Sequence, residues 1–535
     1  MNFAWTNPYP TLRSPLFARN VVATSQPLAA QAGLQMLRAG GNAVDAAIAT
    51  AAAMTIVEPC SNGLGSDNFA ILWDGQELHG LNSSGTAPAG WTLDYFLRKH
   101  GEVYPKRGWD SVTVPGAVAG WVALSERFGK LPFGDLLQPA IELAERGYGV
   151  GVVTADKWAR AVPLLQDQPG FAQAFMPRGR APTPGERFAL PEAGATLRRI
   201  AETRGEAFYR GEIAERLVAH SAAHGGVMAL ADLDAYRPEW VGTISQAFAG
   251  HQVHQIPPNG QGIAALMALG MLEHLDLASL PVDSVESQHL QIEAMKLAFA
   301  DTYRWVADSR AMTAVTPADL LDPAYLAARA RRIDPTRAQD FAHGQPPRGG
   351  TIYLTAADES GMMISLIQSN YMGFGSGIVV PGTGVSLQNR GHCFSLDATH
   401  PNVVAPGKRP FHTIIPGFLM KDGRPQMSFG VMGGNMQPQG HLQSLVRMLV
   451  HGQNPQAACD APRWKVETGL SIDCEHTMAP ALTEGLRALG HGLEATADSY
   501  MDFGSGQFIW RQSDDPEDGY VAASDSRREG QAVGF

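Results

Sequence analysis

The stretch GGTIYLTAADESGMMISLIQS at residues 349–369 contains the features from which both the fold and the chemistry can be predicted. Thr351–Ala357 and Met362–Ser369 are two apolar, partly β-branched runs, and residues 358–361 (DESG) between them have the composition of a turn. Two such runs around a polar turn predict a β-hairpin. The preceding segment, Arg331–Gly350, is rich in Arg, Asp, Gln, Pro and Gly, which is typical of an exposed loop. A loop that stops abruptly at a threonine opening a strand is the first candidate site.

Thr351 can act as a nucleophile only if the chain is cut in front of it. A threonine hydroxyl reacts poorly at neutral pH unless a base lies beside it. Cleavage between Gly350 and Thr351 frees the α-amino group of Thr351, which can then take the hydroxyl proton. Gly349 and Gly350 favour this reaction, because the backbone must distort for the hydroxyl to attack the preceding carbonyl. Without a cut, a threonine at the start of a strand is an ordinary structural residue.

Outside this stretch, the chain alternates between helical and short strand patterns. Val21–Leu37 predicts a short strand followed by a helix, with Ser25 as the N-cap and Pro27 in the first turn. A second helix is predicted over Ala43–Val57, which is alanine-rich and apolar on all sides and should therefore be buried. Further helices are predicted over Val112–Leu124, Phe133–Gly147 and Ser287–Val306, the last of them amphipathic, and further strands over Phe69–Trp73, Gly377–Val380 and Thr413–Met420.

Composition and charge limit the class of protein. The chain has 535 residues and a mass of 57.2 kDa, with 44% hydrophobic and 17% charged residues, which is typical of a globular protein. A net charge of −11 argues against nucleic acid or an anionic membrane as a partner. The best apolar run, Ala46–Val57, is too short to span a bilayer, and Met1–Asn20 lacks the apolar segment of a signal peptide. We therefore expect a cytoplasmic protein.

Several common kinds of site can be set aside by inspection. The four cysteines show no C-x-x-C spacing, so we expect reduced and mostly buried thiols. The sequence contains no H-E-x-x-H motif, Walker loop or G-x-S-x-G elbow. Residues 66–68 match the S-D-N triplet of penicillin-binding enzymes, but no serine has a lysine three positions later, so we interpret the match as a coincidence. We expect neither a metal nor an organic cofactor.

Motifs spread along the chain, in order, resemble those of the γ-glutamyltranspeptidase family of N-terminal-nucleophile hydrolases. The resemblance extends from about Leu16 to Phe535. The matching stretches are RAGGNAVDAA (38–47), VTVPGAVAGW (112–121), EAMKLAFAD (293–301), GGT (349–351), FGSGIV (374–379), KRPFHTIIPGF (408–418), MGGNMQ (432–437) and AASDSRREG (522–530), in which Ser526 stands where proline is common.

The resemblance implies an α+β fold, a four-layer αββα sandwich with a large subunit (residues 1–350) and a small subunit (351–535) intertwined as one globular domain. A dimer of such two-subunit units is compatible with it. The resemblance makes Thr351 the nucleophile and places an oxyanion hole at the backbone amides of Gly433 and Gly434, because a Gly-Gly turn can direct N–H groups at a developing oxyanion. Ser369 matches a hydroxyl that binds the nucleophile's amine, with an ordinary strand-end residue as the alternative.

The substrate pocket departs from the family pattern. The stretch that usually supplies an arginine for an α-carboxylate is residues 84–88 (SGTAP) here and has none. In residues 388–394 (QNRGHCF), Cys393 stands where the family has an acid for the α-amino group. The two serines that usually follow K-R-P are replaced by His412 and Thr413. Because a buried ammonium needs a carboxylate partner, the pocket is poorly suited to a glutamyl head group.

The same stretch has gained Arg390, whose guanidinium fork can bind a carboxylate through two hydrogen bonds. A surface or supporting arginine is the structural alternative. With Asn389, His412 and Thr413 it forms the candidate substrate-binding set. We therefore expect a small amide with an acidic end and no α-amino group.

The patterns LQNRG (387–391) and SNYMGFGSG (369–377) resemble the oxamate amidohydrolase branch of the superfamily, which makes oxamate the candidate substrate. The expected reaction is acyl transfer through an ester on Thr351, completed by water, or by an amine in a transpeptidation. Three alternatives stay open: a γ-glutamyl hydrolase or transferase acting on glutathione, an acylase for glutaryl side chains of β-lactams, and an unprocessed chain that only binds a ligand.

Overall fold

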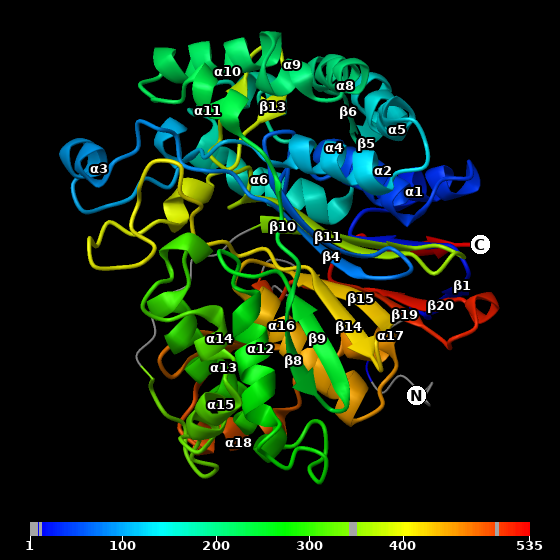
Figure 1. Cartoon of the computed structure of the whole chain (residues 1–535), viewed down its shortest axis with the longest axis vertical. Coiled ribbons are helices and arrows are strands. Elements are labelled where there is room, and N and C mark those ends of the chain that lie inside the picture. The colour runs from blue at the N-terminus through cyan, green and yellow to red at the C-terminus, as the bar shows by residue number, and fades with distance from the viewer. Residues whose placement is uncertain (1–8, 10–12, 342–349, 498–501) are drawn as a thin grey trace.

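Two seven-stranded sheets lie face to face between two layers of helices in the computed structural model (Figure 1), which describes residues 9, 13–341, 350–497 and 502–535. The first sheet contains, in spatial order, β21 (Gln531–Gly534), β2 (Val21–Thr24), β10 (Gly350–Ala357), β11 (Met363–Tyr371), β3 (Asp67–Trp73), β4 (Leu78–Ser83) and β7 (Glu239–Trp240). The second contains β1 (Leu16–Ala18), β20 (Tyr520–Ser524), β19 (Ser505–Arg511), β15 (Arg424–Met432), β14 (Gly417–Lys421), β9 (His251–Gln255) and β8 (Ile244–Phe248). The predicted α+β sandwich of the αββα type is confirmed.

The helices divide into two layers, one on the outer face of each sheet (Figure 1). The layer on the first sheet contains α1 (Pro27–Arg38), α2 (Ala43–Val57), α3 (Leu93–His100), α4 (Ala117–Phe128), α5 (Phe133–Arg146), α6 (Val152–Leu165), α7 (Phe171–Phe175), α8 (Pro191–Thr203), α9 (Glu206–Tyr209), α10 (Glu212–Ala223) and α11 (Leu230–Ala235). The layer on the second contains α12 (Gly262–Leu272), α13 (Val285–Trp305), α14 (Pro317–Leu320), α15 (Pro323–Ala330), α16 (Met436–Leu445), α17 (Pro455–Asp460) and α18 (Pro480–Ala488). Small sheets are formed by β5 (Tyr148–Gly149) with β6 (Arg187–Phe188), by β12 (Val379–Val380) with β13 (Val385–Ser386), and by β16 (Trp464–Thr468), β17 (Ser471–Glu475) and β18 (Gly492–Thr496).

The alanine-rich helix predicted over Ala43–Val57 is present and buried. Helix α2 has the predicted bounds, and each of its residues is buried between the first sheet and its neighbours. Asn42 caps it by accepting from the backbone N–H groups of Val44 and Asp45, while the Asp45 carboxylate accepts from Asn42 N. This reciprocal pair satisfies donors that would otherwise be unpaired inside the core.

The first helix is capped by a different residue from the one predicted. Gln26 is the N-cap of α1 and accepts from Leu28 N at 2.7 Å, whereas Ser25 was expected to do so. The Ser25 hydroxyl is instead committed to Glu58 Oε2 at 2.7 Å. Pro27 opens the helix as predicted, because its missing N–H needs no partner there.

Other predicted elements differ at their ends, largely because of prolines and tertiary hydrogen bonds. Helix α4 begins at Ala117 rather than Val112, since Val112 has an extended backbone and Val114 N binds Thr86 O. Strand β14 begins at Gly417 rather than Thr413, directly after a proline that cannot donate to a ladder. The helix expected from residue 287 begins at Val285 and is buried along most of its length instead of amphipathic. The predicted strand at residues 377–380 shortens to β12, and the predicted helix over residues 133–147 and strand over 69–73 are present as α5 and β3.

The predicted hairpin forms the centre of the first sheet. Strands β10 and β11 pair antiparallel with Leu354 opposite Leu366, and β10 also pairs with β2 on its other side. Both sheets combine strands from before and after residue 351, with β10 enclosed by β2 and β11. A cut before Thr351, as predicted, would therefore leave two interleaved pieces. Gly349 of the predicted junction lies outside the described residues.

The cysteines are reduced, and most of them are buried, as the sequence predicted. All four cysteines are free thiols, and three of them are buried, whereas Cys393 is partly exposed. Within the described residues, we find no helix that combines the length and apolar character required to cross a membrane.

Near the C-terminus, a buried ion network fastens β19 and β20 to the three-stranded sheet. Asp525 accepts from Arg463 Nη2 at 2.8 Å, from Gly506 N at 2.8 Å and from Arg527 Nη1 at 3.1 Å. Arg527 also pairs with Glu475, whose carboxylate lies 2.5 Å away. Burial opposes the charge of Asp525, but the two arginines outweigh it and lower its pKa to about 2.

Replacing this carboxylate is expected to destabilise the fold. Asp525→Asn leaves two buried guanidinium groups short of charge, so we expect a loss of about 3–5 kcal/mol in the free energy of unfolding. Because the pKa of Asp525 is lowered, its contribution is present above roughly pH 4 and is lost as the pH falls towards 2. Thermal unfolding midpoints measured from pH 7 down to pH 2 test this, with the exposed Asp514→Asn as the control. Equal midpoints for the two variants would contradict it.

Candidate active site

The ends of three neighbouring strands bring a threonine, a serine and an aspartate together. Thr351 is the second residue of β10, Ser369 lies near the end of β11, and Asp67 opens β3. Ser369 is the register partner of Asp67 across β11 and β3. The register between β10 and β11 shifts between Gly350 and Ile352, so Thr351 sits at an irregularity of the ladder. Such irregularities re-aim a side chain and are common beside active sites.

Two polar side chains hold the hydroxyl of Thr351, which is only 3% exposed. Thr351 Oγ1 lies 3.2 Å from Ser369 Oγ and accepts from Gln437 Nε2 at 3.4 Å. Ser369 Oγ in turn accepts from Tyr371 N at 2.7 Å, and Gln437 Oε1 accepts from Ile415 N at 2.9 Å. Both neighbours of the hydroxyl are thus fixed by backbone groups. Gln437 closes the MGGNMQ motif but was not among the residues predicted for the site.

The glycine pair predicted as an oxyanion hole lies just before Gln437. Gly433 and Gly434 connect the end of β15 to α16 and have φ angles of +119° and +59°, which L side chains rarely adopt. Their carbonyls are hydrogen-bonded: Gly433 O accepts from Met436 N, and Gly434 O accepts from Gln437 N and from Gln261 Nε2 before α12. Among the described residues, the N–H groups of the pair have no hydrogen-bond partner. Donors at a helix N-terminus suit a developing negative charge.

Arg390 is fully buried at the start of the short helix η3 (Arg390–Cys393). Its Nη1 donates to Thr413 Oγ1 at 2.8 Å, and its Nη2 makes a longer contact of 3.4 Å to Ser369 Oγ. The guanidinium lies over the ring of Tyr371, 4.3 Å from the centroid. Its Nε has no hydrogen-bond partner among the described residues, and the nearest carboxylate oxygen, Asp67 Oδ2, is 3.8 Å away. This buried cation is therefore incompletely satisfied and favours a further anion.

Asp67 and His412 form a buried pair behind the arginine. His412 Nε2 lies 3.0 Å from Asp67 Oδ2, and Ile414 N donates to His412 Nδ1 at 3.3 Å. The ring therefore accepts at Nδ1 and donates at Nε2, which is the neutral form. Burial and the neighbouring Arg390 hold the pKa of His412 well below its usual range. Burial also raises the pKa of Asp67 to about 7, against the opposing effects of Arg390 and of Gly85 N.

Asp67 is the principal residue that our sequence analysis missed. It belongs to the S-D-N triplet at residues 66–68. We set that triplet aside because the chain has no serine with a lysine three positions later, as penicillin-binding enzymes have. Its position beside Ser369 depends on a pairing between strands that lie about three hundred residues apart in the chain, as residues 67 and 369 do. No local pattern reports such a pairing.

Asn389 and Cys393 flank Arg390 and have different surroundings. Asn389 Oδ1 accepts from Met372 N at 3.1 Å, and its Nδ2 donates to Lys106 O at 2.8 Å. This side chain fixes the loop that carries Arg390. Cys393 Sγ lies 4.0 Å from Arg390 Nη1, and burial raises the pKa of the thiol, which keeps it neutral. The structure thus brings together every predicted substrate-binding residue, with Asn389 supporting the loop.

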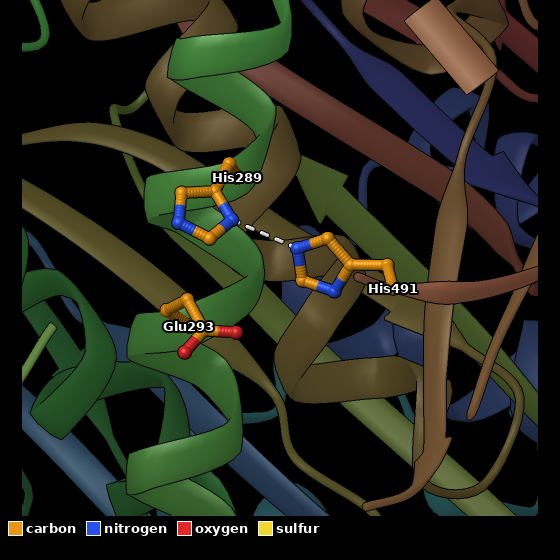
Figure 2. A group of neighbouring side chains, drawn as sticks. All are labelled: His289, Glu293 and His491. Atoms are coloured by element: carbon orange, nitrogen blue, oxygen red, sulfur yellow. Dashed lines mark hydrogen bonds between the residues drawn. The ribbon is translucent and has the colours of Figure 1, made fainter. Parts of the chain in front are cut away.

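A separate buried cluster of two histidines and a glutamate has the composition of a metal site, but a lysine side chain binds to it. Figure 2 shows His289 and Glu293 on α13 facing His491, with His289 Nδ1 hydrogen-bonded to His491 Nε2 at 2.8 Å. Lys296 Nζ donates to Glu293 Oε1 at 2.8 Å and lies 3.4 Å from His491 Nδ1, while His289 Nε2 bonds to Asp334 O. Because an ammonium group occupies the cation position, this cluster is a hydrogen-bonded ion network.

Comparison with known proteins gives a consistent picture. A family model described as gamma-glutamyltranspeptidase matches residues 29–535. The glutathione hydrolase-like YwrD proenzyme of Bacillus subtilis is 36% identical over 98% of this chain and 100% of its own length. The oxamate amidohydrolase proenzyme of Klebsiella pneumoniae is 37% identical over 95% of this chain and 97% of its own. The crystal structure of cephalosporin acylase from Bacillus halodurans has a TM-score of 0.94 and 46% identity, covering 99% of this chain and 98% of that one.

Removing the hydroxyl beside Thr351 is expected to impair its reactivity. Ser369→Ala takes away the group 3.2 Å from Thr351 Oγ1, so the threonine hydroxyl loses its orientation. We expect both chain cleavage and kcat to fall by about 10²-fold. Ser365→Ala is the matched control, because Ser365 is a buried serine on the same strand that contacts Tyr353 OH instead. Cleavage time courses on denaturing gels and initial rates test this, and equal rates for Ser369→Ala and the control would contradict it.

Proposed function

The chain belongs to the γ-glutamyltranspeptidase family of amide-bond hydrolases and acyl transferases, and from this premise we propose that it cuts itself before Thr351 and uses that residue as its nucleophile. Two of its relatives are named as proenzymes, which supports processing into a large subunit (1–350) and a small subunit (351–535). The buried position of Thr351 at the start of a central strand also supports it, because β11 pairs with β10 from its first residues and β2 pairs with residues 354–357, so the strand would stay in the sheet after the cut.

Each step of the proposed reaction has a residue that can perform it. The freed amine of Thr351 takes the proton of its own hydroxyl as Oγ1 attacks the amide carbon. The N–H groups of Gly433 and Gly434 receive the resulting oxyanion. The tetrahedral intermediate collapses, the nitrogen of the substrate leaves with the proton, and an ester remains on Thr351. Water, activated by the same amine, then releases the acid product, and Ser369 and Gln437 orient the hydroxyl throughout.

The incompletely satisfied guanidinium of Arg390 carries the proposal of substrate class. It is fully buried, its one short hydrogen bond within the described part of the chain goes to Thr413, and it lies next to Ser369, which contacts the nucleophile. A substrate carboxylate placed on Arg390 would set its amide carbon close to Thr351. Cys393 is neutral where an ammonium group would need an acid. We therefore propose a small amide that ends in a carboxylate and has no α-amino group, with oxamate as the first candidate.

An acylase acting on a glutaryl-type side chain is the second candidate. The structural similarity to a cephalosporin acylase, at 46% identity, favours it. A glutaryl group also ends in a carboxylate, so Arg390 would bind it in the same way, and the two candidates differ in the length of the acyl group. Hydrolysis of glutathione, which the name of the YwrD relative suggests, requires an acid for the α-amino group in addition.

Oxamate and oxamide test this proposal, because oxamate ends in a carboxylate and oxamide has a neutral amide in the same place. With the processed enzyme, we expect ammonia release from oxamate at a much lower KM than from oxamide. Arg390→Lys keeps the charge but loses the fork, so we expect the KM for oxamate to rise about 10-fold to 100-fold while that for oxamide stays constant. Arg447→Lys, at a buried arginine paired with Asp283, is the control.

A second pair of substrates separates the remaining candidates. γ-Glutamyl anilide and glutaryl anilide differ only in the α-amino group of the former. Preference for glutaryl anilide over both oxamate and γ-glutamyl anilide would identify an acylase. Preference for γ-glutamyl anilide, or an unchanged KM for oxamate in Arg390→Lys, would contradict the proposed role of Arg390.

A further inference from the structure

The buried carboxyl group of Asp67 lies beside the buried guanidinium of Arg390 in the proposed pocket. Asp67 Oδ2 lies 3.8 Å from Arg390 Nε, and both side chains are fully buried. A substrate carboxylate bound by Arg390 would place a second anion within a few ångströms of Asp67. Two carboxylates in a desolvated site cannot both keep their charge at low free energy, so one of them takes a proton.

We propose that Asp67 determines the charge selectivity of the pocket, because its carboxyl group takes up a proton from solvent when the carboxylate of an amide substrate binds to Arg390. This inference rests on the proposed function. The bound state then contains one cation, Arg390, and one anion, the substrate, and Asp67 remains as a neutral hydrogen-bonding group beside His412. In the free enzyme, an ionised Asp67 competes with the substrate for the charge of Arg390.

Apart from Asp67 and Arg390, the groups around Asp67 are neutral or have their own ion-pair partner. The titratable and charged groups that face Asp67 come from four separate segments and are Arg390, Cys393, Arg409, His412, Tyr209 and Tyr236. Arg409 has its own partner, Glu239 Oε1 at 2.6 Å, and His412 is neutral. Burial raises the pKa of Cys393 and of both tyrosines, which are therefore neutral as well.

The environment of Asp67 makes proton uptake accessible near neutral pH. Burial raises its pKa to about 7 in the absence of a ligand, although Arg390 and Gly85 N favour the charged form. A bound carboxylate raises that pKa further. Binding of an anionic amide therefore weakens as the pH rises above about 7, by up to about tenfold per pH unit. Binding of a neutral amide needs no proton at Asp67, so the charge of that carboxyl group should not affect its affinity.

Asp67→Asn tests the inference with the processed enzyme. The asparagine keeps the shape but has no charge and cannot take up the proton. We expect the KM for oxamate at pH 8 to fall about tenfold below that of the unmodified enzyme and to become independent of pH, whereas the KM for oxamide should stay constant. Asp67→Glu, which retains the charge, should restore the rise of KM with pH. Asp301→Asn, at a carboxylate paired with Arg329 in the other helical layer, is the control.

A second measurement does not depend on any variant. Pyruvate has the shape of oxamate but no amide bond to break, so its binding to the processed enzyme can be followed by titration calorimetry. In two buffers of different ionisation enthalpy at pH 8, the difference in heat counts the protons taken up, and we expect up to about one proton for each pyruvate bound.

The outcomes distinguish the inference from the proposed function. If the enzyme prefers oxamate to oxamide but neither Asp67→Asn nor pH alters that preference, and no proton is taken up, the role of Asp67 is overturned and the proposed function stands. If the enzyme does not prefer oxamate to oxamide, the role of Arg390 fails and that of Asp67 fails with it. If Asp67→Asn selectively abolishes hydrolysis of γ-glutamyl anilide, Asp67 binds an ammonium group, which also overturns the inference.

Discussion

The pairing of β10 with β2 on one side and β11 on the other is the interaction on which the proposed enzyme depends. An N-terminal nucleophile stands at a free chain end, and free ends fray unless their backbone is hydrogen-bonded. Here the strand that begins at Gly350 lies at the centre of a seven-stranded sheet and is hydrogen-bonded to neighbours from both sides of the predicted cut. The same pairing aligns Thr351 with Ser369 and, one strand further, with Asp67. The proposed role of Thr351 therefore depends on the strand pairing that also positions it.

The proposed substrate class depends on the charges buried around Arg390. A fully buried guanidinium is tolerated only near compensating charge or good acceptors. Among the residues that the structure describes, Arg390 has one short hydrogen bond, to Thr413, the ring of Tyr371 beneath it, and one carboxylate, Asp67, at 3.8 Å. His412 and Cys393 remain neutral around it. This arrangement is suited to an incoming anion, and Asp67 is the carboxyl group that the described residues place beside Arg390.

The sequence predicted what depends on local pattern and failed where distant contacts decide. The hairpin of β10 and β11 and the bounds of α2 followed from apolar runs and from turn composition. The N-cap of α1 was assigned to Ser25 because a serine there is a good local cap, but Glu58 claims its hydroxyl. Helix α4 begins five residues after the predicted Val112, because Val114 N binds Thr86 O instead of taking part in a helical turn.

In the candidate site, too, residues within motifs were predicted, whereas a residue placed by a distant strand pairing was not. Thr351, Ser369, Arg390 and the glycine pair were all identified from motifs, and the structure brings them together. Asp67 was set aside because its triplet resembled a motif from a different class of enzyme, and only the register of β3 with β11 places it beside Ser369. The pKa of a buried group likewise depends on partners that are distant in sequence, so the electrostatic balance of the pocket could not be predicted.

Intact-mass spectrometry of the freshly purified protein under denaturing conditions, before and after incubation, tests the central claim most directly. Self-processing predicts that the chain of 57.2 kDa is replaced by two fragments with the masses of residues 1–350 and 351–535, and that Thr351→Ala stays whole. A chain that remains intact under all conditions, or a Thr351→Ala variant that is cut at the same place, would contradict the assignment of Thr351 as the nucleophile.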